Sequence, residues 1–339
     1  MKLARLLGRH KGLSDFLDRF AANELDRLLA GIGRSRAVAL EEFPSGGNAL
    51  IRRLVLADGS SLVVRLYFVD PIRQKGLSHW HLNRRLRERG LRVPTIHIRQ
   101  TFPFSRGLSD VDVLIEDFLE GEEINEAALN NRAVCSRLAE VLLRLHEDVS
   151  PSPGRTWTGK ASDDPMREAV AEAPVPFERV RGHLPEITSE HVRHHLAWLR
   201  ECVAKRSVPT SYELVHGDFY PENLLLTPDG AIALIDLGAM AYGCFETDLV
   251  AARQSAPQAN WWKEFCDEYF AARPSVRERF EQNAPLFFAV QCLSKAAHRA
   301  TRARKALEKG KHENAERDRA RAREYWKMLA TAVENNSPR

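Results

Sequence analysis

The stretch LVHGDFYPENLLLTPDGAIALIDLG, residues 214–238, decides how the rest of the chain is organised. Two short apolar runs, residues 224–226 and 232–235, flank a Thr-Pro-Asp-Gly turn at 227–230. Short apolar runs around such a turn are typical of a β-hairpin, because Pro, Asp and Gly favour the backbone angles of tight turns. We therefore predict that residues 224–235 form a hairpin.

Three oxygen-bearing side chains flank this hairpin. Asp218 and Asn223 lie in the polar loop before the first run, and Asp236 follows the second run. A hairpin returns its two ends to the same edge, so we expect Asp236 to come back beside that loop. Two carboxylates and one amide would then form a site for a hard cation, which prefers oxygen ligands.

The bulk composition indicates a two-lobed globular protein. A chain of 339 residues exceeds the roughly 250–300 residues that one hydrophobic core usually serves. Hydrophobic residues make up 44% of the chain and charged residues 28%, as in soluble globular proteins. We expect no transmembrane segment, since no apolar run approaches 18 residues.

The cysteines and the charge bear on compartment and partners. The N-terminus lacks the apolar core of a signal peptide, because charged residues interrupt it. The five cysteines are scattered without a CxxC pair, which suits a reducing cytoplasm. A net charge of +4 does not argue for nucleic acid, which we do not expect as a partner.

The first 68 residues predict a helical extension followed by strands. Residues 1–35 carry leucines and phenylalanines at helical spacing, which fits helices docked on the neighbouring lobe or an oligomer contact. Residues 37–43, 49–56 and 62–68 read as three strands joined by tight turns, an antiparallel meander. Alternation in the third strand places Leu62, Val64 and Leu66 on one face, opposite Val63, Arg65 and Tyr67.

Two features of this meander could bind phosphate. The turn Ser45, Gly46, Gly47 and Asn48 could cradle phosphate with its backbone N–H groups, although such turns are also common without a ligand. The Arg65 guanidinium could fork onto phosphate oxygens. The alternative for Arg65 is a side chain that snorkels off a half-exposed strand.

The middle of the chain alternates between regular and irregular segments. We expect a helix over 78–91, an apolar strand over 111–119 and an amphipathic helix over 133–146. Residues 150–186 are rich in proline and predict an insertion or lid.

The C-terminal part, from residue 245 onward, predicts helices. Trp261, Trp262, Phe265, Tyr269 and Phe270 are spaced as a helix core, with a platform for a ligand as the alternative. The basic residues of 286–330 form either a solvated, salt-bridged face or a patch for an anionic ligand. The histidines at 191, 194 and 195 predict a solvated helix face rather than a metal site, since no acidic or Cys pattern accompanies them.

At this point the chain resembles the aminoglycoside phosphotransferase family, small-molecule kinases with a protein-kinase-like fold. The match consists of His216-Gly-Asp218, Asn223 five residues later, Ile235-Asp236-Leu-Gly and then Asp248-Leu. Supporting matches are Ile115-Glu-Asp-Phe-Leu-Glu-Gly and the helix end Leu-Leu-Arg-Leu-His at 142–146. The resemblance covers roughly residues 37–330. It implies an α+β, bilobal fold with a small antiparallel β-sheet lobe and a larger helical lobe.

The resemblance also implies domains and roles. Residues 1–35 would be an N-terminal extension, 36–118 a nucleotide-binding lobe and 119–335 the helical lobe with the acceptor site. ATP or GTP and Mg²⁺ would be the cofactors, with Asp218 as catalytic base and Asn223 and Asp236 as metal ligands. The nucleotide-binding residues would be Ser45, Gly46, Gly47 and Asn48 over the phosphates, Arg65 at a phosphate, and the backbone of Glu116, Asp117 and Phe118 at the adenine edge. His216 would brace the catalytic loop and Asp248 would anchor it.

Two positions depart from the kinase pattern. Arg65 stands where protein kinases place a lysine. The helix that should supply the pairing glutamate has His79 near the expected position, and its only acid, Glu88, comes almost three turns later. Either the cation pairs differently, or the lobe is rearranged, or the protein is a weakened kinase.

The predicted function is transfer of a phosphoryl group from a nucleotide to a hydroxyl of a small molecule. The helical lobe is not acidic, so a sugar or related metabolite is favoured over a polycationic aminoglycoside. The alternative is a nucleotide-binding interaction module, or weakened kinase, that holds a partner with its basic C-terminal helices. A protein kinase ranks lower, because only twelve residues separate Asp236 from Asp248. The chain would act as a monomer or homodimer.

Overall fold

The computed structural model describes residues 12–42, 49–69, 74–104, 109–154, 164–255 and 261–336. The chain forms two compact units. We call the first the sheet unit (Met1–Ile124, Trp157–Gly159 and Pro221–Ala239) and the second the helical unit (Asn125–Thr156, Lys160–Tyr220 and Met240–Arg339). The central stretch therefore contributes to both units, with the change at Tyr220.

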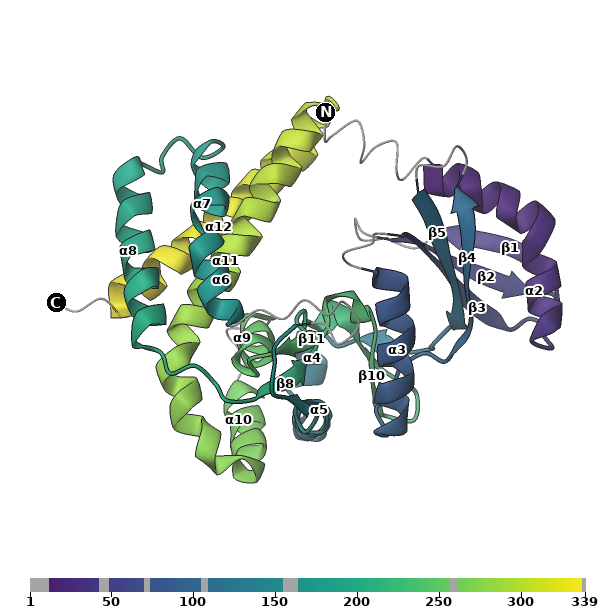
Figure 1. The fold of residues 1–339 in the computed structure, drawn as a ribbon, viewed down its shortest axis with the longest axis horizontal. Helices are drawn as coiled ribbons and strands as arrows, with labels where there is room; N and C mark the ends of the chain where they lie inside the picture. The colour runs from purple at the N-terminus through teal and green to yellow at the C-terminus, as the bar shows by residue number, and fades with distance from the viewer. Residues whose placement is uncertain are drawn as a thin grey trace. The chain divides into compact units, whose positions relative to one another are not determined.

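A five-stranded antiparallel sheet forms the frame of the sheet unit, in the order β1-β2-β3-β5-β4 (Figure 1). Its strands are β1 (Ala37–Glu42), β2 (Leu50–Leu56), β3 (Ser61–Phe68), β4 (Ile96–Phe104) and β5 (Ser109–Asp117). The predicted meander is thus confirmed. Leu62, Val64 and Leu66 of β3 share one buried cluster, as the alternation of apolar residues predicted.

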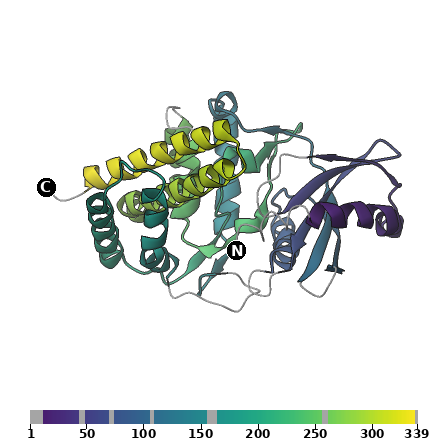
Figure 2. The same ribbon diagram turned by 90° about the horizontal axis from the view of Figure 1, so that it is seen from above.

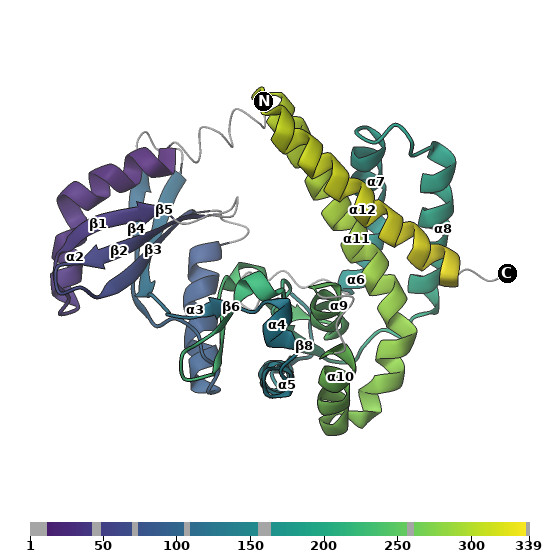
Figure 3. The same cartoon turned by 180° about the vertical axis from the view of Figure 1, so that it is seen from behind.

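The N-terminal helices cover one face of this sheet (Figures 1 and 3). Helical residues 12–20 continue into a π-helical turn (Ala21–Leu25) and α2 (Asp26–Gly31). Their apolar stripe packs on the sheet, and Phe20 meets Phe102 of β4 edge-on at 5.2 Å between ring centroids. The predicted docking of the extension on its neighbouring lobe is confirmed for residues 13–32, and residues 1–11 lie outside the described residues. The segment ends where expected, with Gly33 in the left-handed region at φ 70°.

Helix α3 (Lys75–Glu88) belongs to the opposite face, where Trp80 packs on the smaller cluster of Tyr67, Ile96 and Leu114. It ends with Gly90 at φ 73° and a hydrogen bond from the Leu91 amide to the Leu86 carbonyl, 3.0 Å. This geometry is a Schellman cap, which glycine favours.

The predicted hairpin is confirmed and belongs to the sheet unit. Strands β9 (Leu224–Leu226) and β10 (Ile232–Leu234) pair antiparallel, and Gly230 takes φ 78° in the turn between them. Short strand β6 (Glu122–Glu123) pairs with β9. Arg92 fixes the hairpin to the rest of the unit, because its carbonyl accepts from the Leu234 amide at 2.9 Å and its guanidinium pairs with Asp229 at 2.7 Å.

The helical unit contains a small sheet and a set of packed helices (Figures 1 and 2). The sheet consists of β7 (Val149–Ser150), β8 (Tyr212–Val215) and β11 (Ala241–Gly243). The helices are α4 (Glu126–Leu129), α5 (Arg132–His146), α6 (Pro165–Glu172), α7 (Pro174–Arg181), α8 (Ser189–Lys205), α9 (Glu246–Ser255), α10 (Trp261–Ala272), α11 (Arg277–Leu307) and α12 (His312–Asn336). The two longest, α11 and α12, lie side by side in every view (Figures 1–3).

One expectation for this unit is confirmed and one is wrong in part. Trp261, Phe265, Tyr269 and Phe270 are buried, as a core helix requires. The solvated face predicted for the three histidines is confirmed at His191 and His194, which are exposed, but is wrong at His195, which is only 4% exposed and stacks on the Trp326 ring of α12 at 5.0 Å. Sequence spacing could not show that a second helix covers that position. Within the described ranges, no helix is long and apolar enough to cross a membrane.

Candidate functional site

Arg65 lies in the middle of β3 and is almost fully buried, at 6% exposure. Its Nε and Nη2 atoms both donate to Oε1 of Glu116, at 3.1 and 3.0 Å. The snorkelling alternative is therefore wrong. A cation removed from water needs a counter-charge, and Glu116 on β5 supplies it.

Glu116 continues this pair into a longer chain of contacts. Its second oxygen, Oε2, lies 3.5 Å from Nε2 of His79 on α3. The other ring nitrogen of His79, Nδ1, lies 3.1 Å from the Tyr67 hydroxyl. All four side chains are buried in the sheet unit.

Helix α3 has no glutamate that pairs with Arg65, because Glu116 of strand β5 takes that role. Burial lowers the pKa of His79 to about 4, with Glu116 working against this and Arg65 adding to it, so the ring is neutral at pH 7. Burial also acts to lower the pKa of Arg65, but the negative charge of Glu116, with a smaller contribution from Asp236, outweighs it and the pKa is raised. Within this series of polar contacts, the charged pair is therefore Arg65 and Glu116.

The register of the sheet explains why these side chains meet. Arg65 is opposite Leu114 and Val63 is opposite Glu116. Side chains alternate faces along a strand, so Leu114 and Glu116 point to the same face as Arg65. The alternation in residues 111–116 was a signal for this partner, and sequence reasoning used Glu116 only for its backbone.

Asp117 and Phe118 lie where the chain leaves β5. The Asp117 carboxylate accepts from the Thr95 amide at 3.2 Å and contacts His97 Nε2 at 2.6 Å. Burial acts to raise the pKa of Asp117, but these hydrogen bonds outweigh it and the pKa is lowered. The Arg53 guanidinium lies over the Phe118 ring at 4.5 Å from its centroid.

Asn223 and Asp236 stand at the open end of the hairpin. Asn223 ends a short 3-10 turn (Pro221–Asn223), and its carbonyl accepts from the Ile235 amide at 3.0 Å. Asp236 has a left-handed backbone at φ 55°, a costly conformation for a residue with a side chain and one concentrated at functional sites. Its side chain is 54% exposed, and its Oδ1 lies 4.0 Å from Nη1 of Arg65. The structure thus brings Arg65 and Asp236 together within one unit.

The loop with Asp218 belongs to the helical unit, where Asp248 holds it. The amides of His216 and Gly217 donate to the two carboxylate oxygens of Asp248, at 2.7 and 2.8 Å. Gly217 adopts φ 75°, which a residue with a side chain would rarely take. The predicted anchoring role of Asp248 is confirmed, and Asp218 follows directly as a half-buried residue.

Asp248 is itself fixed by the helices around it. It is fully buried, and its Oδ2 lies 3.2 Å from Nε2 of His146 at the end of α5. His146 Nδ1 lies 2.8 Å from the Tyr269 hydroxyl, to which Arg273 donates at 2.6 Å. These contacts form a continuous chain if His146 donates to Asp248 and Tyr269 donates to His146.

Tyr220, two residues after Asp218, joins the same loop to three further helical positions. Its amide donates to the Asp218 carbonyl at 2.8 Å. Its hydroxyl lies 3.3 Å from Oε1 of Gln254 on α9 and from Oε1 of Gln291 on α11, which share its one proton, and the Lys295 ammonium lies 3.4 Å from its ring centroid. These contacts carry no motif that the sequence could have revealed. The predicted phosphate turn of Ser45, Gly46, Gly47 and Asn48 lies outside the described residues.

The fold is that of a kinase-like phosphotransferase. It is defined by the antiparallel sheet with its adjoining helix, by the helical unit, and by the loop and hairpin that bear Asp218, Asn223 and Asp236. A family model described as "Phosphotransferase enzyme family" matches residues 39–279, well over half of the chain. The chain belongs to this family. The predicted enzyme class, a phosphotransferase with an alcohol group as acceptor, is thereby confirmed.

Solved structures of low sequence identity share the fold. A thermostable mutant of aminoglycoside phosphotransferase APH(4)-Ia, in a complex with ADP and hygromycin B, is 15% identical with a TM-score of 0.63, over 93% of this chain and 99% of that one. The GDP complex of aminoglycoside 2'-phosphotransferase-IIIa is 13% identical, with a TM-score of 0.59, over 91% and 97%. A putative fructosamine-3-kinase from Thermobifida fusca is 19% identical, with a TM-score of 0.58, over 88% and 99%. No curated protein matches the chain.

Proposed function

We propose that the chain transfers the γ-phosphoryl group of ATP, or GTP, to a hydroxyl of a small molecule, with Asp218 as the base. The observation that carries this proposal is the Arg65–Glu116 pair, which holds a guanidinium 4.0 Å from Asp236 in the unit that also contains Asn223. A fixed cation beside a strained, exposed carboxylate is the arrangement that nucleotide phosphates and their metal require.

In the reaction, a bond forms between the acceptor oxygen and the γ-phosphorus while the bond to the β–γ bridging oxygen breaks. Asp218 accepts a hydrogen bond from the acceptor hydroxyl and takes its proton as the new bond forms. Asp248 fixes the backbone from which the Asp218 side chain projects, because it accepts hydrogen bonds from the amides of His216 and Gly217. The nucleoside diphosphate leaves with the bridging oxygen.

Asn223 and Asp236 would hold Mg²⁺. Their amide and carboxylate oxygens fit a hard cation, which is commonly bound through one or two carboxylates together with nucleotide phosphates. The ion would neutralise charge on the phosphates in the transition state. The 54% exposure of Asp236 leaves its carboxylate accessible for this role.

Arg65 would contact a phosphate, and the chain just after β5 would pair with the adenine edge. Among the predicted residues Glu116, Asp117 and Phe118, we favour Phe118. β5 is an inner strand, and the Asp117 amide already donates to the Thr95 carbonyl at 2.9 Å, whereas the chain leaves the sheet at Phe118. Ser45, Gly46, Gly47 and Asn48 stay the proposed cover for the phosphates.

Sugars and related metabolites are the proposed acceptors, and the cytoplasm is the proposed compartment. The acceptor proposal rests on the helical lobe, which is not acidic. The compartment proposal rests on the five cysteines, which are all free.

The test is turnover of ATP and Mg²⁺ with panels of sugars, amino alcohols and aminoglycosides, read as phosphomonoester formation. We expect product with at least one panel, no product with Asp218→Asn, and equal nucleotide affinity in the two proteins. Nucleotide binding without product from any panel would favour a binding module instead. Equal turnover in Asp218→Asn would remove Asp218 as the base.

A further inference from the structure

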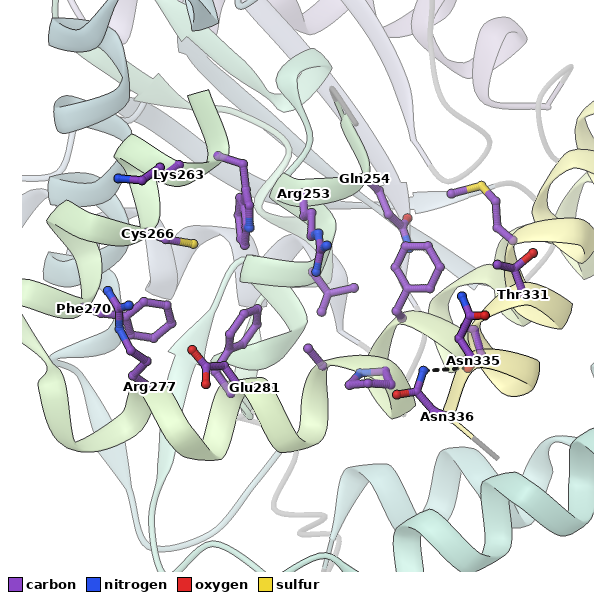
Figure 4. Close-up of a pocket in the computed structure, with 18 of the residues that line it drawn as sticks. Arg253, Gln254, Lys263, Cys266, Phe270, Arg277, Glu281, Thr331, Asn335 and Asn336 are labelled. Atoms are coloured by element: carbon purple, nitrogen blue, oxygen red, sulfur yellow. Dashed lines mark hydrogen bonds between the residues drawn. The ribbon is translucent and has the colours of Figure 1, made fainter. Parts of the chain in front are cut away.

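A cavity of about 950 Å³ lies among helices α9, α10, α11 and α12 of the helical unit (Figure 4). Much of its wall is apolar: Val250, Trp262, Phe270, Phe280, Phe288 and Met328. Cavities of this size hold small molecules of drug or metabolite size. Aromatic rings favour a ligand with a flat or apolar body of its own.

The rim of the cavity carries an excess of positive charge. Lys263 and Arg277 both pair with Asp267, at 2.8 and 3.6 Å. Arg253 and Lys327 have no carboxylate partner among the described residues, and Arg253 lies 5.9 Å from the Trp262 ring centroid. Glu281 is the remaining acid of the rim, so four cations face two carboxylates and leave two net positive charges. A ligand with a negatively charged group complements this rim.

The wall also offers neutral polar groups. Pro285 sits inside α11 and cannot donate to the Glu281 carbonyl, which therefore has no partner in the helical pattern. Both residues line the cavity. Thr331 and Asn335 of α12 add hydroxyl and amide groups (Figure 4).

One cavity residue is hydrogen-bonded to the loop that carries Asp218. Gln254 lines the cavity and accepts from the Tyr220 hydroxyl at 3.3 Å. The second acceptor of that hydroxyl, Gln291, lies one helical turn beyond the cavity residue Phe288 on α11. A cation, Lys295, contacts the Tyr220 ring. The cavity and the catalytic loop are thus joined through a single side chain.

We infer that this cavity binds the phosphoryl acceptor, and that the acceptor is an amphipathic alcohol with an apolar or aromatic body and an anionic group. The apolar wall favours such a metabolite over the neutral sugar that the charge of the helical lobe alone allows. This inference rests on the proposed function. The body would lie against the aromatic wall and the anion at Arg253 and Lys327. The hydroxyl would leave the cavity at Gln254, on the side of Tyr220 and the catalytic loop. A polycationic aminoglycoside would meet like charge at the same rim.

Binding is tested first, without catalysis, using two fluorescent probes of similar shape. We expect anionic 1-anilinonaphthalene-8-sulfonate to bind saturably, and Arg253→Met/Lys327→Met to weaken it about tenfold, as the loss of two rim charges predicts. Neutral N-phenyl-1-naphthylamine should change less than about twofold. Lys309→Met, at an exposed lysine outside the cavity, is the matched control and should change neither.

A cavity-filling variant, Ala284→Trp, should weaken both probes, because Ala284 is buried in the wall. The cavity assignment is overturned if the double variant and Ala284→Trp leave both affinities unchanged. Circular dichroism of each variant verifies that the helices are intact.

Turnover then connects the cavity to catalysis. We expect 6-hydroxymethyl-2-naphthoate to exceed 2-naphthalenemethanol in kcat/KM, and the double variant to reduce this preference about tenfold through KM. If only aminoglycosides are phosphorylated, and the double variant phosphorylates them as fast as the wild type, the cavity is not the acceptor site. The proposed function would still stand in that case. Absence of phosphorylated product from every alcohol contradicts the proposed function, and the probe affinities then decide the cavity separately.

Discussion

Replacing Glu116 with Gln tests how the sheet unit holds its cation. The variant keeps the shape of the side chain but removes the charge that faces Arg65. The two side chains are 8% and 2% exposed, so water cannot replace the lost partner. Removing one member of a buried pair typically costs about 3–5 kcal/mol, because the other charge stays buried without compensation.

We expect a value near the lower end of this range for Glu116→Gln. The Gln side chain still presents one carbonyl oxygen to the guanidinium, and Asp236, at 4.0 Å from Arg65 Nη1, offers partial compensation. A loss of about 3 kcal/mol in the free energy of unfolding therefore follows. Arg65 should also turn toward Asp236, which would weaken nucleotide binding.

Urea unfolding measures the first effect, and titration with a fluorescent ADP analogue measures the second. Glu88→Gln is the matched control, because Glu88 pairs with Arg84 at 2.9 Å but the two side chains are 60% and 80% exposed. Its cost should stay within about 0.5 kcal/mol. The double variant Arg65→Met/Glu116→Leu should recover most of the stability and none of the nucleotide affinity, since it removes both charges. If Glu116→Gln costs no more than Glu88→Gln, the account of a buried pair is refuted.

Two further predictions concern the same unit. The pKa of His79 is lowered to about 4, so the unfolded chain binds more protons between pH 6.5 and 4 and the free energy of unfolding falls as the pH drops through this window. His79→Gln should remove a change on the order of 3 kcal/mol in the free energy of unfolding across this pH window. If the difference in free energy between the wild type and the variant does not change with pH, the buried neutral imidazole is contradicted. Gly121→Ala should cost roughly 1–3 kcal/mol in thermal unfolding, because its Cβ would meet the Leu226 carbonyl oxygen at 2.9 Å. Gly31→Ala, where a Cβ has open space, should cost far less, and equal losses in the two variants would contradict this close approach.

The local parts of this fold could be read from the sequence, because their signals are local. The hairpin of residues 224–234 follows from two apolar runs and a Pro-Asp-Gly turn, and the meander follows from alternation between tight turns. The ends of the N-terminal segment and of α3 follow from glycines that adopt left-handed angles. Each of these features depends on residues within a few positions of one another.

The partners within the site could not be read in this way. Arg65 and Glu116 are 51 positions apart, and only the pairing of β3 with β5 brings them together. Alternation in β5 would have placed Glu116 on the correct face, but the register between the strands is a property of the folded sheet. The stacking of His195 on Trp326 and the bond from Tyr220 to Gln254 likewise depend on helix packing.

The family and the sheet unit together explain why an arginine can stand at the third strand. The guanidinium has a rigid fork of donors, and two of them are used by one carboxylate oxygen of Glu116. The third nitrogen of the guanidinium, Nη1, lies 4.0 Å from Oδ1 of Asp236. A lysine would offer three donors on one freely rotating nitrogen, without the fixed planar fork that directs the guanidinium to both carboxylates.

The measurement that tests the central claim most directly is binding of a non-hydrolysable ATP analogue with and without Mg²⁺. It compares the wild-type chain with Arg65→Ala and Asp236→Asn. We predict tighter binding with Mg²⁺ in the wild type, loss of this Mg²⁺ dependence in Asp236→Asn, and weaker binding in Arg65→Ala at every Mg²⁺ concentration. Unchanged affinity and unchanged Mg²⁺ dependence in both variants would contradict the assignment of this site.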